Sequence, residues 1–260
     1  MITKFGAFSA FLILFFTFQQ SPKTAINKKI VNLRFLNYQL SMKAFVAGAT
    51  GETGRRIVKE LLKQNIPVRA LVRNLETGQE ILPSEAELAV GDVLKPESIS
   101  EAIADCTVLL CATGARPNFD PSGPYRVDYE GTKNLVEVAK SKGIEHFVLV
   151  SSLCVSQLFH PLNLFWLILV WKKRAEAYLQ KSGLTYTIVR PGGLRNDESS
   201  DRLMMSGADT LFDGSLPRTK VAQVCVAALS EPASHNKIVE IVAKPDAPAK
   251  TFPELFANVS

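Results

Sequence analysis

The segment from Lys43 to Gly54 constrains the fold of this 260-residue chain more than any other part of its sequence. A short apolar run is followed by three glycines, Gly48, Gly51 and Gly54, in the spacing Gly-x-x-Gly-x-x-Gly. Apolar residues then recur at helical spacing from Arg55 to Gln64. The order strand, glycine turn and helix is typical of a turn that binds a dinucleotide.

The physical reason lies in the backbone. A glycine permits a sharp turn with positive φ, and a missing Cβ lets the chain approach a pyrophosphate closely. The free N–H groups and the positive end of the helix dipole then face the phosphates. The residues that we predict to bind the pyrophosphate are Gly48, Thr50, Gly51, Glu52, Thr53 and Gly54.

Beyond this turn, apolar runs of strand length alternate with helical patterns to the end of the chain. This alternation predicts an α/β fold with a doubly wound parallel sheet, here an NAD(P)-binding Rossmann domain over residues 42–260 with a small C-terminal lobe. The length suits one domain of this kind.

Charge and cysteine spacing exclude several classes of function. The net charge of +5 comes from five basic residues in 1–41, so residues 42–260 carry 25 basic and 25 acidic residues. A neutral body gives no reason to expect a nucleic-acid partner. None of the four cysteines forms a Cys-x-x-Cys pair, and the three histidines are scattered, so we predict no metal site.

Residues 1–41 form an N-terminal extension that we place outside the fold. Phe5 to Phe18 is almost entirely apolar, and the residues after it are basic and lack acids. A removable targeting segment, a mis-assigned start with Met42 as the true N-terminus, and a membrane anchor are the three interpretations. The apolar run is short of the roughly 20 residues that span a membrane.

The end of the second predicted strand selects the cofactor. NAD sites commonly hold the ribose 2′-hydroxyl with an acid there, whereas this chain has Arg73. A guanidinium suits a 2′-phosphate, so we predict NADP(H) in preference to NAD(H). The alternative is that Arg73 is a solvated strand-end charge.

Two further strand ends complete the predicted cofactor site. Asp92 and Val93 follow the third strand, beside the expected adenine, although Asp92 also suits a turn cap. Ala112, Thr113 and Gly114 follow the fourth strand, where ligands of doubly wound sheets bind.

Taken together, the motifs resemble those of the atypical short-chain dehydrogenase/reductases, in particular the NmrA-like NAD(P)-binding group. The resemblance is to cyanobacterial and plastid members, similar to the NAD(P)-binding domain of the redox-sensing subunit of the plastid import translocon. The segments that carry it are 48–54, Val72-Arg73-Asn74, Gly91-Asp92-Val93, 131–135, 147–152 and 187–194.

The resemblance implies site residues on the helix after the fifth strand. Lys172 falls where the family places its active-site lysine, yet Ile168 stands four residues earlier where the family has tyrosine. An isoleucine transfers no proton, so the usual general acid is missing. Lys172 is expected to bond the nicotinamide ribose, unless it is only a solvated lysine. Ser152, with Ser151, is expected to orient a substrate carbonyl or to line the cofactor, and Pro191 and Gly192 to close over the nicotinamide end.

Two other patterns lie near this helix. Tyr129 and Lys133 match Tyr-x-x-x-Lys, but they follow the fourth strand rather than the fifth, so we interpret them as noncatalytic. The helix predicted over 163–181 is apolar on most sides in its first half. This pattern favours a core or a homodimer or partner face, with membrane contact through Trp166 and Trp171 as the less favoured alternative.

These observations leave three functional hypotheses. The favoured one is an NADPH-dependent oxidoreductase acting on a small organic acceptor that the sequence does not identify. The others are a noncatalytic NADP(H) redox sensor that docks a partner, and a membrane-associated accessory factor. The expected location is the cytoplasm for a bacterial chain, and the plastid for one from a plant or alga.

Overall fold

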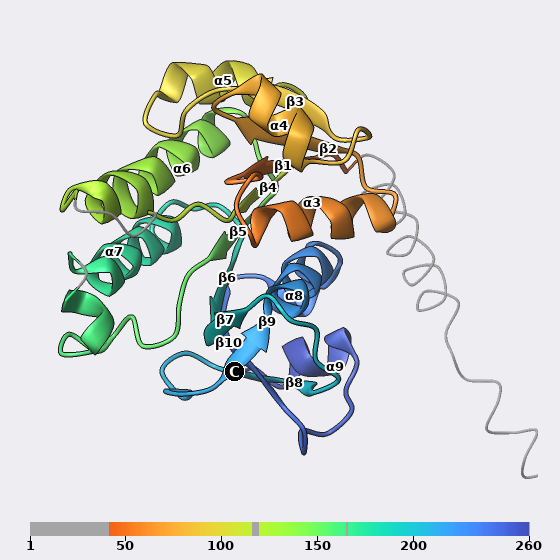
Figure 1. Cartoon of the computed structure of the whole chain (residues 1–260), viewed down its shortest axis with the longest axis vertical. Coiled ribbons are helices and arrows are strands. Elements are labelled where there is room, and N and C mark those ends of the chain that lie inside the picture. The colour runs from red at the N-terminus through yellow and green to blue at the C-terminus, as the bar shows by residue number, and fades with distance from the viewer. Residues whose placement is uncertain (1–41, 116–119, 165, 260) are drawn as a thin grey trace, which may run out of the picture. The chain divides into compact units, whose positions relative to one another are not determined.

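The central feature of the fold is an eight-stranded sheet with the order β3-β2-β1-β4-β5-β6-β10-β8 (Figure 1). The computed structural model describes residues 42–115, 120–164 and 166–259, and the interpretations of 1–41 fall outside them. All strand pairs in the sheet are parallel except β10 with β8. The strands are β1 (Ala44–Ala47), β2 (Val68–Val72), β3 (Glu87–Val90), β4 (Val108–Cys111), β5 (His146–Val150), β6 (Tyr186–Pro191), β8 (Arg202–Ser206) and β10 (Lys237–Lys244).

Helices cover both faces of this sheet, as the continuous apolar strands require. On one face α3 (Gly54–Lys63) packs beside α8 (Arg218–Ser230). On the other face α5 (Pro96–Ile103), α6 (Gly131–Ser141) and α7 (Ile168–Gln180) follow one another (Figure 1). The remaining elements are α4 (Leu75–Ile81), the π-helix η1 (Tyr125–Glu130), the 3₁₀ helices η2 (Pro161–Leu164) and η3 (Pro232–Ser234), α9 (Phe252–Ala257), and a small sheet of β7 (Gly193–Arg195) and β9 (Ser215–Pro217).

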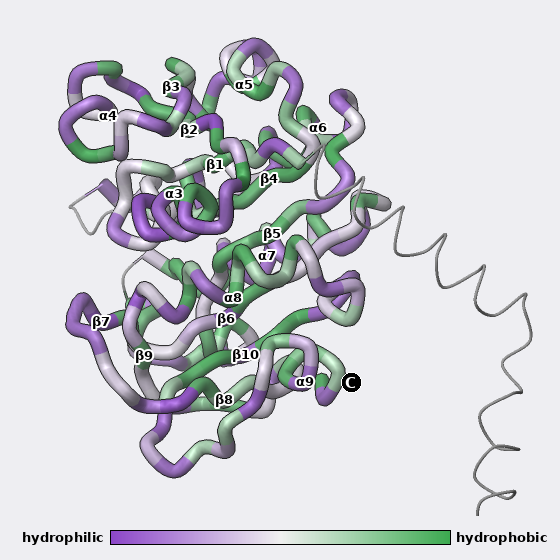
Figure 2. Tube along the Cα trace, turned by 90° about the vertical axis from the view of Figure 1, so that its right-hand side faces the viewer, coloured by the Kyte–Doolittle hydropathy of each residue, from purple (hydrophilic) through white to green (hydrophobic). Residues whose placement is uncertain are grey.

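The main core lies between the sheet and α5, α6 and α7. Phe45, Leu109 and Phe147 on the strands meet Leu135 on α6, and all four are fully buried. Figure 2 shows the hydrophobic residues concentrated along inner strands such as β4, β5 and β10. The predicted doubly wound α/β fold is confirmed.

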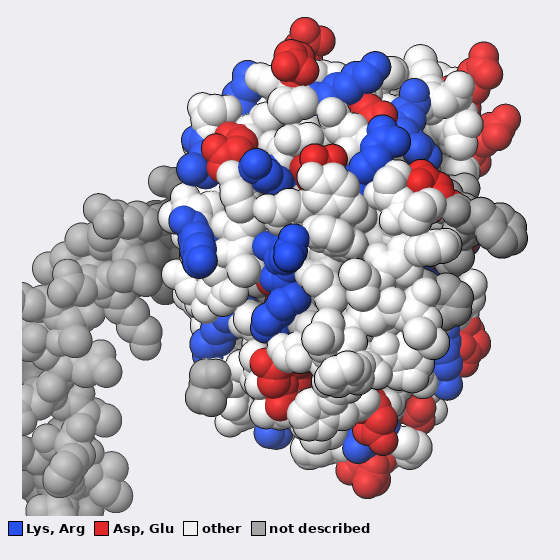
Figure 3. All heavy atoms as spheres, turned by 90° about the vertical axis from the view of Figure 1, so that its left-hand side faces the viewer, with Lys and Arg blue, Asp and Glu red and all other residues white. Residues whose placement is uncertain are grey.

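The helix predicted over 163–181 differs from the observed one. Trp166 and Leu167 both have positive φ, so η2 ends and α7 begins only at Ile168. The core alternative is wrong for much of the first half of the predicted helix, since Leu164 is 84 % exposed and Leu167 is 46 % exposed, whereas Leu169 is buried. Figure 3 views the side of the molecule on which α6 and α7 lie, and a broad part of it carries no charged side chains. The predicted homodimer or partner face remains a prediction.

The polar segment 196–214 contains a strand of the main sheet. Its residues Arg202–Ser206 form β8, which pairs antiparallel with β10 at the edge of the main sheet. The chain then turns through 207–214 and enters β9. This turn returns the chain to the carboxyl end of β6, where the site lies.

Candidate functional site

Two cavities meet where the carboxyl ends of the parallel strands converge. The distal cavity, of about 500 Å³, lies beyond β2 and β3 and is lined by Arg73 and by 91–94. The central cavity, of about 980 Å³, lies beyond β5 and β6 and is lined by 150–154, Lys172 and 191–194. Both share Thr50, Gly51 and Ala112 to Ala115 as lining. The junction lies between β1 and β4, the switch point of strand order where doubly wound sheets bind ligands.

The glycine turn forms the floor of this junction. Gly48 has a φ of +77°, and a Cβ there would lie 2.6 Å from the carbonyl oxygen of Ala112. A Cβ on Gly54 would lie 2.0 Å from the carbonyl oxygen of Gly48, so α3 begins directly against the turn. Gly54 is not among the residues that line either cavity. Its role is to set the position of the helix N-terminus. This cradle fits a pyrophosphate.

The predicted residues of the adenosine end all line the distal cavity, namely Arg73, Asp92 and Val93. Arg73 forms no ion pair with any described residue, whereas Arg55 and Arg56 both pair with Glu52, at 2.7 and 2.9 Å. Asp92 accepts a hydrogen bond from the backbone N–H of Leu94 at 2.9 Å, so it also has the turn-capping role.

Arg126 is a lining residue of the distal cavity that our sequence analysis missed. It belongs to η1, a π-helix, and such turns are frequent at functional sites. No local pattern identifies it, because its place in the cavity follows from how η1 packs against α7 rather than from neighbouring residues.

Lys172 lines the central cavity and makes a buried ion pair. Its ammonium lies 2.7 Å from Oδ1 of Asp128, whose side chain is 1 % exposed. The other carboxylate oxygen of Asp128 accepts a hydrogen bond from the backbone N–H of Ala115 at 3.1 Å. Burial lowers the pKa of Lys172, but Asp128 outweighs it and the net pKa is raised. The lysine is therefore held as a cation, and Asp128 was not predicted because it lies 44 residues away.

The two predicted serines have different environments. Ser151 donates a hydrogen bond of 2.6 Å to Oε1 of the buried Glu176. Ser152 also lines the central cavity, and its hydroxyl has no hydrogen-bond partner among the described residues. Of the two serines, Ser152 is thus the one whose hydroxyl is available to a ligand.

The Tyr129 and Lys133 pattern lies on the outer surface of η1 and α6. The ring of Tyr129 lies 6.1 Å from that of Trp171, and the Lys133 ammonium lies 5.6 Å from the centre of the Tyr178 ring. Neither residue is among those that line the two cavities.

A family model described as NAD(P)H-binding matches residues 48–232, which include the glycine turn and Lys172. The chain belongs to the NmrA-like NAD(P)H-binding family. The predicted resemblance is thereby confirmed, and this NmrA-like protein has an oxidoreductase-like NAD(P)H-binding fold.

Several relatives are plastid proteins or reductases. An uncharacterised chloroplastic protein of Arabidopsis thaliana is 43 % identical, over 94 % of this chain and 92 % of its own length. Protein TIC 62 of Pisum sativum, also chloroplastic, is 36 % identical over 83 % of this chain but only 45 % of its own length. Sanguinarine reductase of Eschscholzia californica is 30 % identical over 84 % of this chain and 96 % of its own length.

Solved structures agree on the fold. An NAD-dependent epimerase/dehydratase-type protein of Bacillus halodurans has a TM-score of 0.73 and 28 % identity, over 83 % of this chain and 99 % of its own. A short-chain dehydrogenase/reductase of Veillonella parvula, solved in complex with NADP, has a TM-score of 0.63 and 17 % identity, over 79 % of this chain and 99 % of its own.

In this NmrA-like protein the position at which the resemblance predicts tyrosine is occupied by a residue that lines neither cavity. Ile168 is the first residue of α7 and packs with an apolar cluster that includes Leu169 and Val242. It is not among the residues that line the central cavity. Among the described residues, no helix is long and apolar enough to cross a membrane.

Proposed function

We propose that this NmrA-like protein is an NADPH-dependent reductase of an organic acceptor that binds in the central cavity. The observation that carries the proposal is the extent of this cavity. It begins at the glycine turn, passes Lys172 and continues to Leu194 and Phe212. Its volume of about 980 Å³ is at the upper end of ordinary ligand pockets, so an acceptor has room beside the nicotinamide.

The roles of the residues follow from their contacts. NADPH, when bound, supplies the hydride. The Lys172 ammonium, oriented by Asp128, holds the nicotinamide ribose. Ser152 donates a hydrogen bond to the acceptor carbonyl, and water in the open cavity supplies the proton that Ile168 cannot.

The preference for NADPH rests on Arg73. Its guanidinium borders the distal cavity without an ion-pair partner among the described residues, while Arg55 and Arg56 are both paired with Glu52. An uncommitted guanidinium stabilises a 2′-phosphate through charge-assisted bonds.

The relatives support the reaction class and a location. Sanguinarine reductase is a relative along nearly its whole length, which supports reduction of an organic acceptor. The chloroplastic relatives support a plastid location if the chain comes from a plant or alga. The cytoplasm is our proposal for a bacterial source.

A second candidate function is the NADP(H) sensor that docks a partner. It is favoured by the exposed apolar side chains of Phe159 and Leu164, which lie in sequence on either side of His160 and Leu162, two lining residues of the central cavity. A partner seated there would contact the mouth of the cofactor site.

One experiment separates the two functions. The full chain is titrated with NADPH and NADH by intrinsic fluorescence, and NADPH oxidation is then followed at 340 nm with quinones, flavins and aldehydes. Tight NADPH binding with turnover of one acceptor class supports the reductase. Tight binding without turnover supports the sensor, and no nucleotide binding overturns both.

A further inference from the structure

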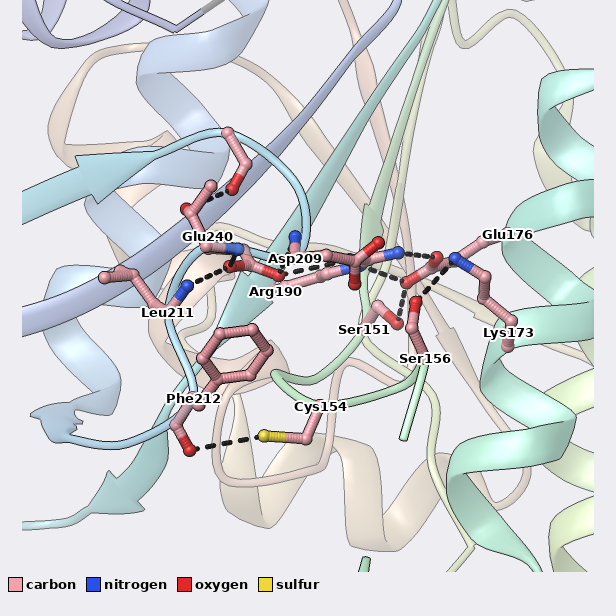
Figure 4. A network of polar contacts seen from close by, with 12 residues as sticks. Ser151, Cys154, Ser156, Lys173, Glu176, Arg190, Asp209, Leu211, Phe212 and Glu240 are labelled. Carbon is pink, nitrogen blue, oxygen red and sulfur yellow. Dashed lines mark hydrogen bonds and ion pairs between the residues drawn. The ribbon is translucent and has the colours of Figure 1, made fainter. Parts of the chain in front are cut away.

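A buried carboxylate accepts hydrogen bonds from the backbone of the turn over 207–214, which connects β8 and β9. Glu240 on β10 is fully buried and accepts hydrogen bonds from three successive backbone N–H groups. These N–H groups belong to Asp209, Thr210 and Leu211, with distances of 2.8, 2.9 and 2.7 Å. Figure 4 shows Glu240 against this turn. Residues 209–211 are therefore fixed to the main sheet.

A buried arginine connects this turn to the serine at the end of β5. Nη1 of Arg190 donates to Glu240 at 3.1 Å and to Asp209 at 2.9 Å. Its Nε and Nη2 donate to Glu176, at 3.0 and 2.7 Å, and Glu176 accepts the hydroxyl of Ser151 (Figure 4). The network thus extends from the cofactor side of the central cavity to its outer wall.

The next residue of the turn, Phe212, is fixed at its backbone as well. Its carbonyl oxygen accepts the thiol of Cys154 at 3.3 Å. Yet its side chain stays 55 % exposed while lining the central cavity. An apolar ring that remains in contact with water, on a backbone held at four successive residues, is suited to a ligand that covers it.

Burial of this charged network costs desolvation free energy, so the network is not explained by a gain in stability. Burying one guanidinium and two carboxylates is weak support for stability, because desolvation offsets most of the attraction. What such a network does achieve is a defined geometry, here that of the cavity wall beside Phe212. A rigid aromatic face on that wall favours a flat aromatic ligand, since stacked or edge-on rings attract beyond their buried area.

We propose that Phe212 is a specificity-determining residue that contacts a planar aromatic acceptor, of the size of a naphthoquinone or larger, and that Glu240 is the positioning residue that holds it. This inference rests on the proposed reductase function and gives its acceptor class. Ser152, Lys172 and Phe212 all line the same cavity.

The test compares Phe212→Ala, Phe212→Tyr and the control Phe159→Ala in the full chain. Phe159 is also an exposed phenylalanine, but it is not in the lining of the cavity. Two readouts are used, the KM for menadione in NADPH oxidation and the Kd for riboflavin, followed by flavin fluorescence with NADP⁺ present. We expect Phe212→Ala to raise both by about tenfold, the upper range of a ring–ring contact.

Three accompanying results make the assignment specific. Phe212→Tyr should restore both values to within about twofold, and Phe159→Ala should match the wild type, since only a ring on the cavity wall contributes. The KM for hexanal, which has no ring, should rise less than the KM for menadione in Phe212→Ala, because hexanal loses only apolar contact area. Glu240→Gln should raise the menadione KM in the same direction, with NADPH affinity unchanged.

The contrary results are distinct from a failure of the proposed function. If Phe212→Ala keeps wild-type values for menadione and riboflavin, the contact is wrong. If the wild type binds NADPH but neither reduces menadione nor quenches riboflavin, the aromatic acceptor class is wrong. If NADPH itself does not bind, the proposed function fails and this inference fails with it.

Discussion

The cofactor-binding part of this site and its acceptor-facing part are built differently. The glycine turn brings its residues together within seven positions, 48–54, and the chain carries them directly from β1 into α3. The acceptor side joins residues that are far apart, such as Glu240 with Leu211 and Arg190 with Glu176. Local backbone chemistry determines the first part, and packing of the whole sheet determines the second.

This difference predicts how each part responds to change. A turn that depends on the absence of Cβ atoms should lose its function abruptly with one methyl group. A network of long-range ion pairs should lose stability or specificity in steps, according to which partner is removed. The four predictions below test this contrast.

The largest loss of cofactor affinity is expected for Gly54→Ala. The new Cβ would lie 2.0 Å from the Gly48 carbonyl oxygen, so α3 must move away from the turn. We expect NADPH affinity to fall by about 100-fold, since displacement on this scale costs up to about 3 kcal/mol. Isothermal titration calorimetry of the folded variant measures it.

Gly143→Ala is the matched control for that substitution. Gly143 has a φ of +69°, but a Cβ there would meet no atom within 4 Å. The residue precedes the amino end of β5, whereas the site lies at the carboxyl ends of the strands. Its Tm should fall slightly because of the left-handed conformation, with NADPH affinity unchanged. Equal loss of affinity in both variants would contradict the proposed role of Gly54.

The same contrast explains what could be predicted from the sequence. The doubly wound fold, the glycine turn and the family were predictable, because each depends on periodicity or on contiguous motifs. The exposure of Leu164 was not, because an apolar run does not report that Leu167 interrupts the helix with a left-handed φ. The ion pair of Lys172 with Asp128 was also not predictable, since helix packing alone brings them together.

The largest loss of folding stability is expected for Asp128→Asn. The substitution leaves the largely buried ammonium of Lys172 without its carboxylate, which typically costs about 3–5 kcal/mol of folding free energy. Chemical denaturation at pH 7 measures the loss. Lys172→Met in the same background should recover part of it, because the buried charge is then gone. If Asp128→Asn is as stable as the wild type, the pair does not hold Lys172.

The pH dependence gives an independent check on this pair. The pKa of Lys172 is raised above its ordinary value of 10.5, with Asp128 outweighing burial. A cation of this kind contributes stability that is present in full below the unfolded pKa and is lost as pH rises through the folded pKa. The Tm of the wild type should therefore fall more steeply than that of Asp128→Asn above about pH 10.5.

A moderate effect is expected for Arg73→Ala. Loss of a guanidinium facing a 2′-phosphate should lower the ratio of NADPH to NADH affinity by about tenfold, the scale of one charge-assisted hydrogen bond. Arg73→Lys should give an intermediate ratio, because it keeps the charge but not the fork. Arg55→Ala is the control, since Arg55 is already paired with Glu52. Parallel titrations with both nucleotides decide, and an unchanged ratio for Arg73→Ala removes the assignment.

The smallest effects separate two neighbouring serines. Ser151→Ala removes a hydroxyl that donates to Oε1 of Glu176, but Nε of Arg190 still donates to the same oxygen, so the loss should cost about 0.5–1.5 kcal/mol of folding free energy. Ser152→Ala removes a hydroxyl that no described residue uses, so its Tm should match the wild type. Its kcat/KM for the acceptor should instead fall by about threefold to tenfold, the contribution of one neutral hydrogen bond.

Thermal unfolding and steady-state kinetics of both serine variants give the comparison directly. Two hydroxyls one residue apart would then act on different properties, Ser151 on the network that shapes the cavity and Ser152 on the ligand within it. The reverse pattern, with Ser152→Ala destabilised and Ser151→Ala slowed only in turnover, would mean that Ser151 faces the acceptor. The network through Glu176 and Arg190 would then belong to the reaction itself rather than to the wall around it.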